Sequence, residues 1–81
     1  MTRQSPQTFP LSMAAVGDRV RILSHRPGKG IEKRLSGLGL HPGSVVEVVQ
    51  QQGGGGLVVA REGGRIALGL GIALKIMVTP A

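Results

Sequence analysis

The sequence contains no cysteine, no tryptophan and no tyrosine, and Phe9 is its only aromatic residue. Without cysteine the chain can form neither a disulfide framework nor a thiolate metal site. With one aromatic side chain it cannot build a platform on which bases stack, nor an aromatic groove for proline-rich peptides. These absences exclude several common ways in which a small domain gains stability or recognises a ligand.

Acidic residues are also few. Ten Lys and Arg residues stand against four Asp and Glu residues, which gives a formal net charge of +6. This excess of positive charge favours an anionic partner, such as nucleic acid, a membrane surface or the acidic face of a protein. The same charge would also serve simply to keep a small protein in solution, and the charge alone does not separate these two interpretations.

The chain has 81 residues, the size of one small domain with a modest core. Residues 1–10 are polar, include two prolines and lack periodicity, so we expect a flexible N-terminal tail followed by a domain over residues 11–81. The apolar segment Ile66–Leu74 is much shorter than the ~20 residues of a transmembrane helix. No segment resembles a secretory signal. We therefore expect a soluble protein, and the lack of cysteine fits the cytoplasm.

The rest of the pattern is mostly that of β-strands. Between residues 19 and 23, Val20 and Ile22 alternate with arginines, which is typical of a half-buried strand. Four further strands are predicted over residues 44–49, 57–61, 65–68 and 75–79. Residues 62–64 predict a tight hairpin, and residues 69–73 a single helical turn. The glycine-rich residues 50–56 are predicted to be a flexible hairpin loop with no capacity to pack.

One segment has helical periodicity. Ile31, Leu35 and Leu38 are spaced to lie on one face of a helix over residues 31–38. A stop signal follows, because Gly39 suits the left-handed position after a helix and Leu40 can fold back as an apolar contact. Pro42 would then prevent the helix from continuing.

These elements predict a mainly β protein, a small five-stranded SH3-like barrel with one short α-helix. The residues expected to form its core are apolar side chains from every predicted element: Val20, Ile22, Leu35, Leu38, Val46, Val48, Val58, Ile66, Leu68, Ile76 and Val78.

The sequence shows no catalytic constellation, so we do not expect an enzyme. Its two histidines, His25 and His41, lie in predicted loops rich in Gly and Pro, and the glycine-rich segments lack the spacing of a phosphate-binding loop. No cofactor is required by any motif. His25 and His41 are the first candidates for a transition metal ion bound at the surface, and the alternative is two solvated histidines.

Nucleic acid is a further alternative for a basic barrel, since Lys and Arg side chains give sequence-independent affinity for phosphates. Six basic residues lie close together in the sequence: Arg19, Arg21, Arg26, Lys29, Lys33 and Arg34. However, the chain lacks both stacking aromatic residues and a helix-turn-helix pair. Nucleic acid is therefore not the expected natural partner.

The segment Arg34–Gly43, RLSGLGLHPG, resembles the RLxxLGLxPG signature of the ferrous iron transport protein A (FeoA) family. Residues 11–18, residues 65–68 and the closing segment 73–78 are also similar to that family, and the resemblance covers residues 11–79. Ala14 and Val16 replace a Leu and a Pro that are frequent in the family, and the run of glycines at residues 53–56 is unusual.

The resemblance implies an SH3-like fold and a cytoplasmic accessory protein of bacterial ferrous iron uptake. It also implies a partner, the FeoB-type membrane transporter with its cytoplasmic GTPase domain, whose activity such a protein would modulate. The candidate partner-binding residues lie in or next to the signature: Arg34, Leu38, Gly39, Leu40, His41 and Pro42. The fold is also similar to a domain of iron- and manganese-dependent repressors, which leaves a metal-responsive regulatory module as the alternative. Open strand edges would allow a homodimer.

Overall fold

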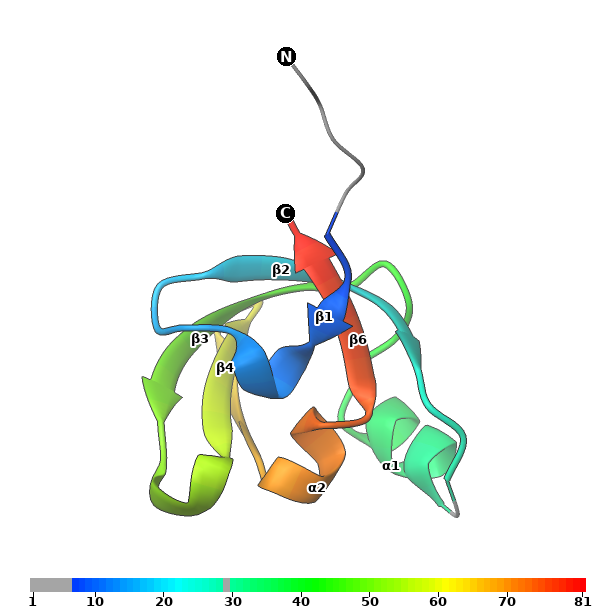
Figure 1. Ribbon diagram of the computed structural model, residues 1–81. Coiled ribbons are helices and arrows are strands. Elements are labelled where there is room, and N and C mark those ends of the chain that lie inside the picture. Colours follow the sequence, from blue (N-terminus) through cyan, green and yellow to red (C-terminus); the bar gives the residue numbers. More distant parts are fainter. Residues whose placement is uncertain (1–6, 29) are drawn as a thin grey trace.

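The computed structural model describes residues 7–28 and 30–81, which form one antiparallel sheet with two short α-helices (Figure 1). In chain order, the elements are β1 (Phe9–Pro10), the 3-10 turn η1 (Leu11–Met13), β2 (Arg19–His25), α1 (Ile31–Gly37), β3 (Val45–Gln51), the 3-10 turn η2 (Gly53–Gly55), β4 (Leu57–Arg61), β5 (Gly64–Leu68), α2 (Leu70–Ala73) and β6 (Ile76–Pro80). The strand order is β1-β6-β2-β3-β4-β5, and each strand pairs antiparallel with its neighbours.

The predicted fold class is confirmed, with one strand more than expected. Phe9 and Pro10 form the short strand β1, which pairs with Val78 and Met77 of β6. The prediction of a flexible tail over residues 1–10 is therefore wrong for Phe9 and Pro10. Residues 1–6 of that segment lie outside the described residues. Phe9 packs against the core, and Pro10 is tolerated because β1 is an edge strand, where a residue without an N–H group need not break a ladder.

The core lies on the inner face of the curled sheet. Every second side chain along the strands points into it. Eight predicted core residues are buried: Val20, Ile22, Leu35, Val46, Val48, Leu68, Ile76 and Val78. Leu38 and Ile66 are only half-buried and pack against the edge of this core.

The prediction chose the wrong face of β4 for the core, because it placed Val58 inward. Leu57 and Val59 are buried, whereas Val58 lies on the other face and is partly exposed. The segment is apolar on both faces, so its pattern does not show which face points inward. The pairing with β5 determines this, because it sets Leu57 opposite Leu68 and Val59 opposite Ile66.

The N-terminal segment contributes core residues that the sequence did not reveal. Leu11 and Ala14 are almost fully buried, and the Ala14 amide donates to the Leu11 carbonyl at 2.9 Å, which closes η1. η1 contacts both α2 and β6, and Ala73 of α2 is also buried. These turns lie against the sheet (Figure 1) and complete the cover over the core.

The glycine-rich loop does pack, contrary to the prediction. It forms η2, and the Gln52 amide donates to the Gly56 carbonyl at 2.8 Å. Gly56 is buried, and a Cβ at this position would lie 2.8 Å from the Leu68 carbonyl oxygen. Only glycine allows this approach, so the loop is fixed against β5 by backbone contact.

None of the helices within residues 7–28 and 30–81 has the length and apolar character that crossing a membrane requires.

The packing of α1 on the sheet can be tested with Leu35→Ala. Leu35 is 3% exposed in the core, so its truncation should lower the free energy of unfolding by roughly 2–5 kcal/mol. Leu74→Ala is the matched control, because Leu74 is 47% exposed, and it should cost less than about 1 kcal/mol. Urea denaturation of both variants measures the difference. Equal losses would show that Leu35 is not part of the core.

Candidate functional site

The signature segment begins in α1 and ends in a tightly bonded turn. Gly39 has a φ of 77°, in the left-handed region, and its amide donates to the Ser36 carbonyl at 3.0 Å. The Leu40 amide reaches back to the Leu35 carbonyl at 2.9 Å. These two bonds make a Schellman motif, which confirms the predicted helix stop. Leu40 is 3% exposed, so the turn is held by a buried leucine as well as by hydrogen bonds.

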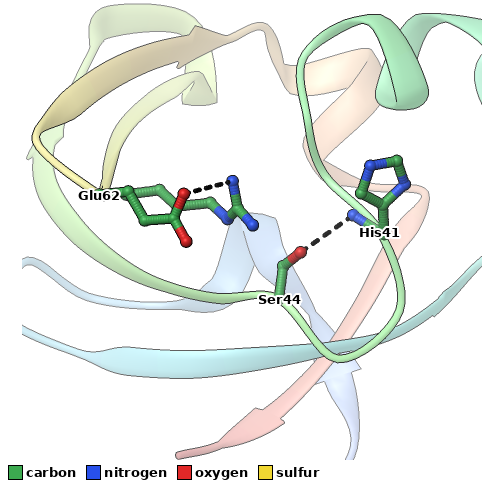
Figure 2. A network of polar contacts seen from close by, with 4 residues as sticks. His41, Ser44 and Glu62 are labelled. Carbon is green, nitrogen blue, oxygen red and sulfur yellow. Dashed lines mark hydrogen bonds and ion pairs between the residues drawn. The ribbon is translucent and has the colours of Figure 1, made fainter.

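The loop that follows is fixed at both ends. The His41 amide donates to Ser44 Oγ at 3.1 Å (Figure 2), and the Ser44 amide donates to the His41 carbonyl at 2.9 Å. The Gly43 amide donates to the Ile22 carbonyl at 2.7 Å, and the Ile22 amide donates to the Ser44 carbonyl at 2.8 Å. The loop is therefore tied to β2, and His41 and Pro42 are exposed on a fixed backbone.

The end of β2, α1 and this loop surround an open hollow of about 660 Å³, which we call the histidine hollow. The residues that line it come from all three segments: His25, Glu32, Lys33, Leu35, Ser36, Gly37, Leu40, His41 and Pro42. Both candidate metal ligands thus lie on one hollow, although 15 residues separate them in the chain. That grouping depends on the path of α1 and cannot be read from their spacing.

The candidate partner-binding residues fall into three groups. Arg34, His41 and Pro42 are exposed, and Leu38 and Gly39 are half-buried. Leu40 was among the candidate partner-binding residues, but it is buried in the core. A direct contact between Leu40 and a partner therefore does not fit the structure. Its role is to hold the turn from inside.

The histidine hollow is not a formed metal centre. Among the described residues, no group of three or more His, Cys, Asp or Glu side chains is close enough to hold a metal ion. His25 Nδ1 lies 3.2 Å from the Arg26 carbonyl oxygen. Among residues 7–28 and 30–81, no hydrogen bond links the side chain of either histidine to an acidic or hydroxyl side chain.

A second hollow, which sequence reasoning missed, opens on the outer face of the sheet and has a volume of about 480 Å³. We call it the arginine hollow, since Arg19, Arg61 and Arg65 line it, together with Glu47 and Glu62. The Arg61 side chain is 27% exposed, and its Nη1 atom lies 3.4 Å from Glu62 Oε1 (Figure 2). Arg19 lies on β2, and Arg61 and Arg65 lie on the two strands of the β4–β5 hairpin, so the pairing of the strands brings the three arginines together.

Arg61 also connects this hollow with the turn after α1. A Cβ atom at Gly39 would lie 3.6 Å from Arg61 Nη1, so the guanidinium lies beside the end of the helix. A positive charge is favourable there, because the last carbonyl groups of a helix carry partial negative charge. The two hollows are thus neighbours across the signature turn.

A curled antiparallel sheet of short strands with two short α-helices defines a small domain of the SH3-like fold class. The sequence agrees with a more specific assignment. Residues 9–80 match the model of the FeoA domain, and the chain belongs to this family.

Individual relatives support the same assignment. The chain is 36% identical over 73 residues to the "Putative Fe(2+) transport protein A" of Methanocaldococcus jannaschii, a match that covers 90% of this chain and 88% of the relative. The crystal structure of an iron uptake regulatory protein (FeoA) superposes with a TM-score of 0.79 at 29% identity, covering 89% of this chain and 95% of that one.

The fold recurs in a larger protein of another kind. A manganese-dependent transcriptional repressor superposes with a TM-score of 0.86, covering 96% of this chain and 44% of the repressor. The sequence identity is 19%, so this likeness concerns the fold alone.

The turn after α1 can be tested by two alanine substitutions with opposite expected signs. Gly39→Ala should destabilise the protein by about 1–2 kcal/mol, because a side chain resists the left-handed backbone at this position. Gly37→Ala should stabilise it by about 0.5–1 kcal/mol, because Gly37 is helical and a Cβ there meets nothing within 4 Å. Thermal or urea unfolding measures both. A stabilising Gly39→Ala would contradict the left-handed turn.

Proposed function

We propose that this protein is an accessory protein of ferrous iron uptake. It binds the cytoplasmic region of a FeoB-type, GTPase-bearing membrane transporter and modulates the activity of that transporter. Membership of the FeoA family supports the proposal, as does a relative that carries the name of an Fe(2+) transport protein.

The single observation that carries the proposal is the form of the signature segment. Its leucines at positions 35 and 40 are buried, while Arg34, His41 and Pro42 are exposed around the rim of α1 and its turn. The loop is cross-linked by hydrogen bonds to β2 and to Ser44. A fixed loop loses little conformational entropy on binding, so it is well suited to docking.

The histidine hollow gives this docking surface its shape. Its lining joins the exposed Pro42 and the imidazoles of His25 and His41 to charged side chains of α1, and the buried Leu35 and Leu40 support it from the core. A lining that mixes polar and apolar groups in this way is compatible with a surface that receives side chains of another protein.

The proposal predicts that changes at the exposed rim weaken binding without unfolding the protein. Arg34→Glu and His41→Ala should each weaken binding to the full-length transporter in nanodiscs by about fivefold to thirtyfold. Arg21→Glu is the control for Arg34→Glu, because it makes the same charge change at an exposed position of β2, outside both the signature segment and the histidine hollow. Binding and GTP hydrolysis are measured side by side. If the unaltered protein does not bind the full-length transporter, the proposal is wrong.

A metal-responsive regulatory role is a second candidate, and one observation favours it. His25 and His41 line the same hollow, so two imidazoles could serve one transition metal ion, with further ligands from water or a partner.

Calorimetric titration with Fe²⁺, Mn²⁺ and Zn²⁺ tests this role. Binding that is lost in the double variant His25→Ala/His41→Ala, and retained in Glu62→Gln, would place the metal in the histidine hollow. No binding by the unaltered protein, or unchanged binding by the double variant, would rule out this site.

A further inference from the structure

The strand β5 lies at one edge of the sheet and pairs with β4 on one side only. The other side of β5 has no neighbour strand among residues 7–28 and 30–81. An edge of this kind carries backbone N–H and C=O groups that can pair with another chain.

The hairpin between β4 and β5 shows which backbone groups face the free side. Glu62 and Gly63 have φ values of 49° and 82°, and two successive positive φ values in a two-residue connection are those of a type I′ turn. In such a hairpin the flanking pair, Arg61 and Gly64, exchanges both hydrogen bonds, and the pairs then alternate along the ladder. Gly64, Ile66 and Leu68 therefore bond to β4.

The remaining two residues of the strand, Arg65 and Ala67, direct their N–H and C=O groups away from β4. Both residues are exposed. The Ala67 side chain is small, and a Cβ added at Gly64 would meet only the Arg61 carbonyl oxygen, at 3.7 Å. The edge is thus accessible to an extended chain, which could form hydrogen bonds with the backbone at two positions.

The charge beside this edge is not balanced. Across the sheet, Arg19 lies opposite Glu47, and Glu62 lies 3.4 Å from Arg61. Arg65 lies opposite Ala60 and makes no ion pair within 4.0 Å to any described residue. Arg65 also lines the arginine hollow, so an acidic side chain on an added strand would find a cation next to it and a space of about 480 Å³ behind it.

We propose that the free edge of β5 binds an extended acidic segment of another protein by strand addition. The backbone of Arg65 and Ala67 supplies the hydrogen bonds, and Arg65, with the arginine hollow, receives the carboxylates. This surface is separate from the histidine hollow and does not depend on a transporter as the partner.

An acidic partner fits this edge better than a second copy of the chain. Each copy carries a net charge of +6, so two copies repel one another as they approach. An arginine on a short edge strand also discourages pairing with neutral β-strands. A strand that carries carboxylates is attracted to the positively charged protein instead of being repelled. The arginine on the edge then favours its pairing.

The test is an NMR titration of the full chain with a short peptide of alternating threonine and glutamate, and with its lysine counterpart. The glutamate peptide should shift the amide signals of Arg65 and Ala67 and slow their hydrogen exchange. The lysine peptide should shift neither signal. Equal responses to both peptides, or no response to either, would overturn the proposal.

Two pairs of variants separate backbone pairing from charge. Ala67→Pro removes the outward N–H group without removing a bond to β4, and should weaken peptide binding by about tenfold or more. Ala67→Thr keeps that group and should retain binding. Arg65→Glu should weaken binding by a similar factor, whereas Arg21→Glu, the control for overall charge, should change it about twofold at most.

Two other results would show that the edge has a different occupant. Concentration-dependent dimerisation that is lost in Ala67→Pro would assign the edge to a second copy. Binding of a single-stranded oligonucleotide that depends on Arg65 and exceeds binding of the glutamate peptide would assign the arginines to phosphates. Either result would overturn the proposal.

Discussion

The structure depends most on one turn, in which Gly39 takes a left-handed conformation and Leu40 folds back under α1. The two backbone bonds of this turn, to Ser36 and Leu35, end a helix of seven residues that could not persist alone in water. Because Leu40 is buried in the same core as Leu35, the turn fixes the helix on the sheet. The exposed residues of the signature are therefore presented by a backbone that is already ordered.

The same constraint joins the two surfaces for which we propose functions. On one side of the turn, the histidine hollow gathers side chains from β2, α1 and the loop. On the other side, Arg61 lies beside Gly39 and forms part of the arginine hollow, which extends to the edge strand β5. The molecule is small, but its strand pairing and one helix stop create two chemically different faces. The first face is suited to docking by shape, and the second to recognition of acidic chains.

Much of this arrangement could be predicted from the sequence, because local signals and the fold agree. The alternation at Val20 and Ile22 and the stop signal at Gly39 each have a short-range cause, and each was predicted correctly. The phase of β4 was not predictable, since Leu57, Val58 and Val59 are all apolar and only the pairing with Leu68 and Ile66 selects the inward face. The strand β1 and the packing of Gly56 on Leu68 were missed for a similar reason. Both arise from contacts between segments that are far apart in the chain or that lack any side-chain pattern. The grouping of His25 with His41, and of Arg19 with Arg65, likewise comes from the topology.

The central claim is that the segment from Arg34 to Pro42 is the surface that meets the transporter. Hydrogen–deuterium exchange of the full chain, alone and with the full-length transporter in nanodiscs, tests this claim most directly. We predict that exchange slows at Arg34, His41 and the residues around the histidine hollow, where a bound partner would exclude solvent. Protection confined to β1 and β6, with exchange around the signature turn unchanged, would contradict the account.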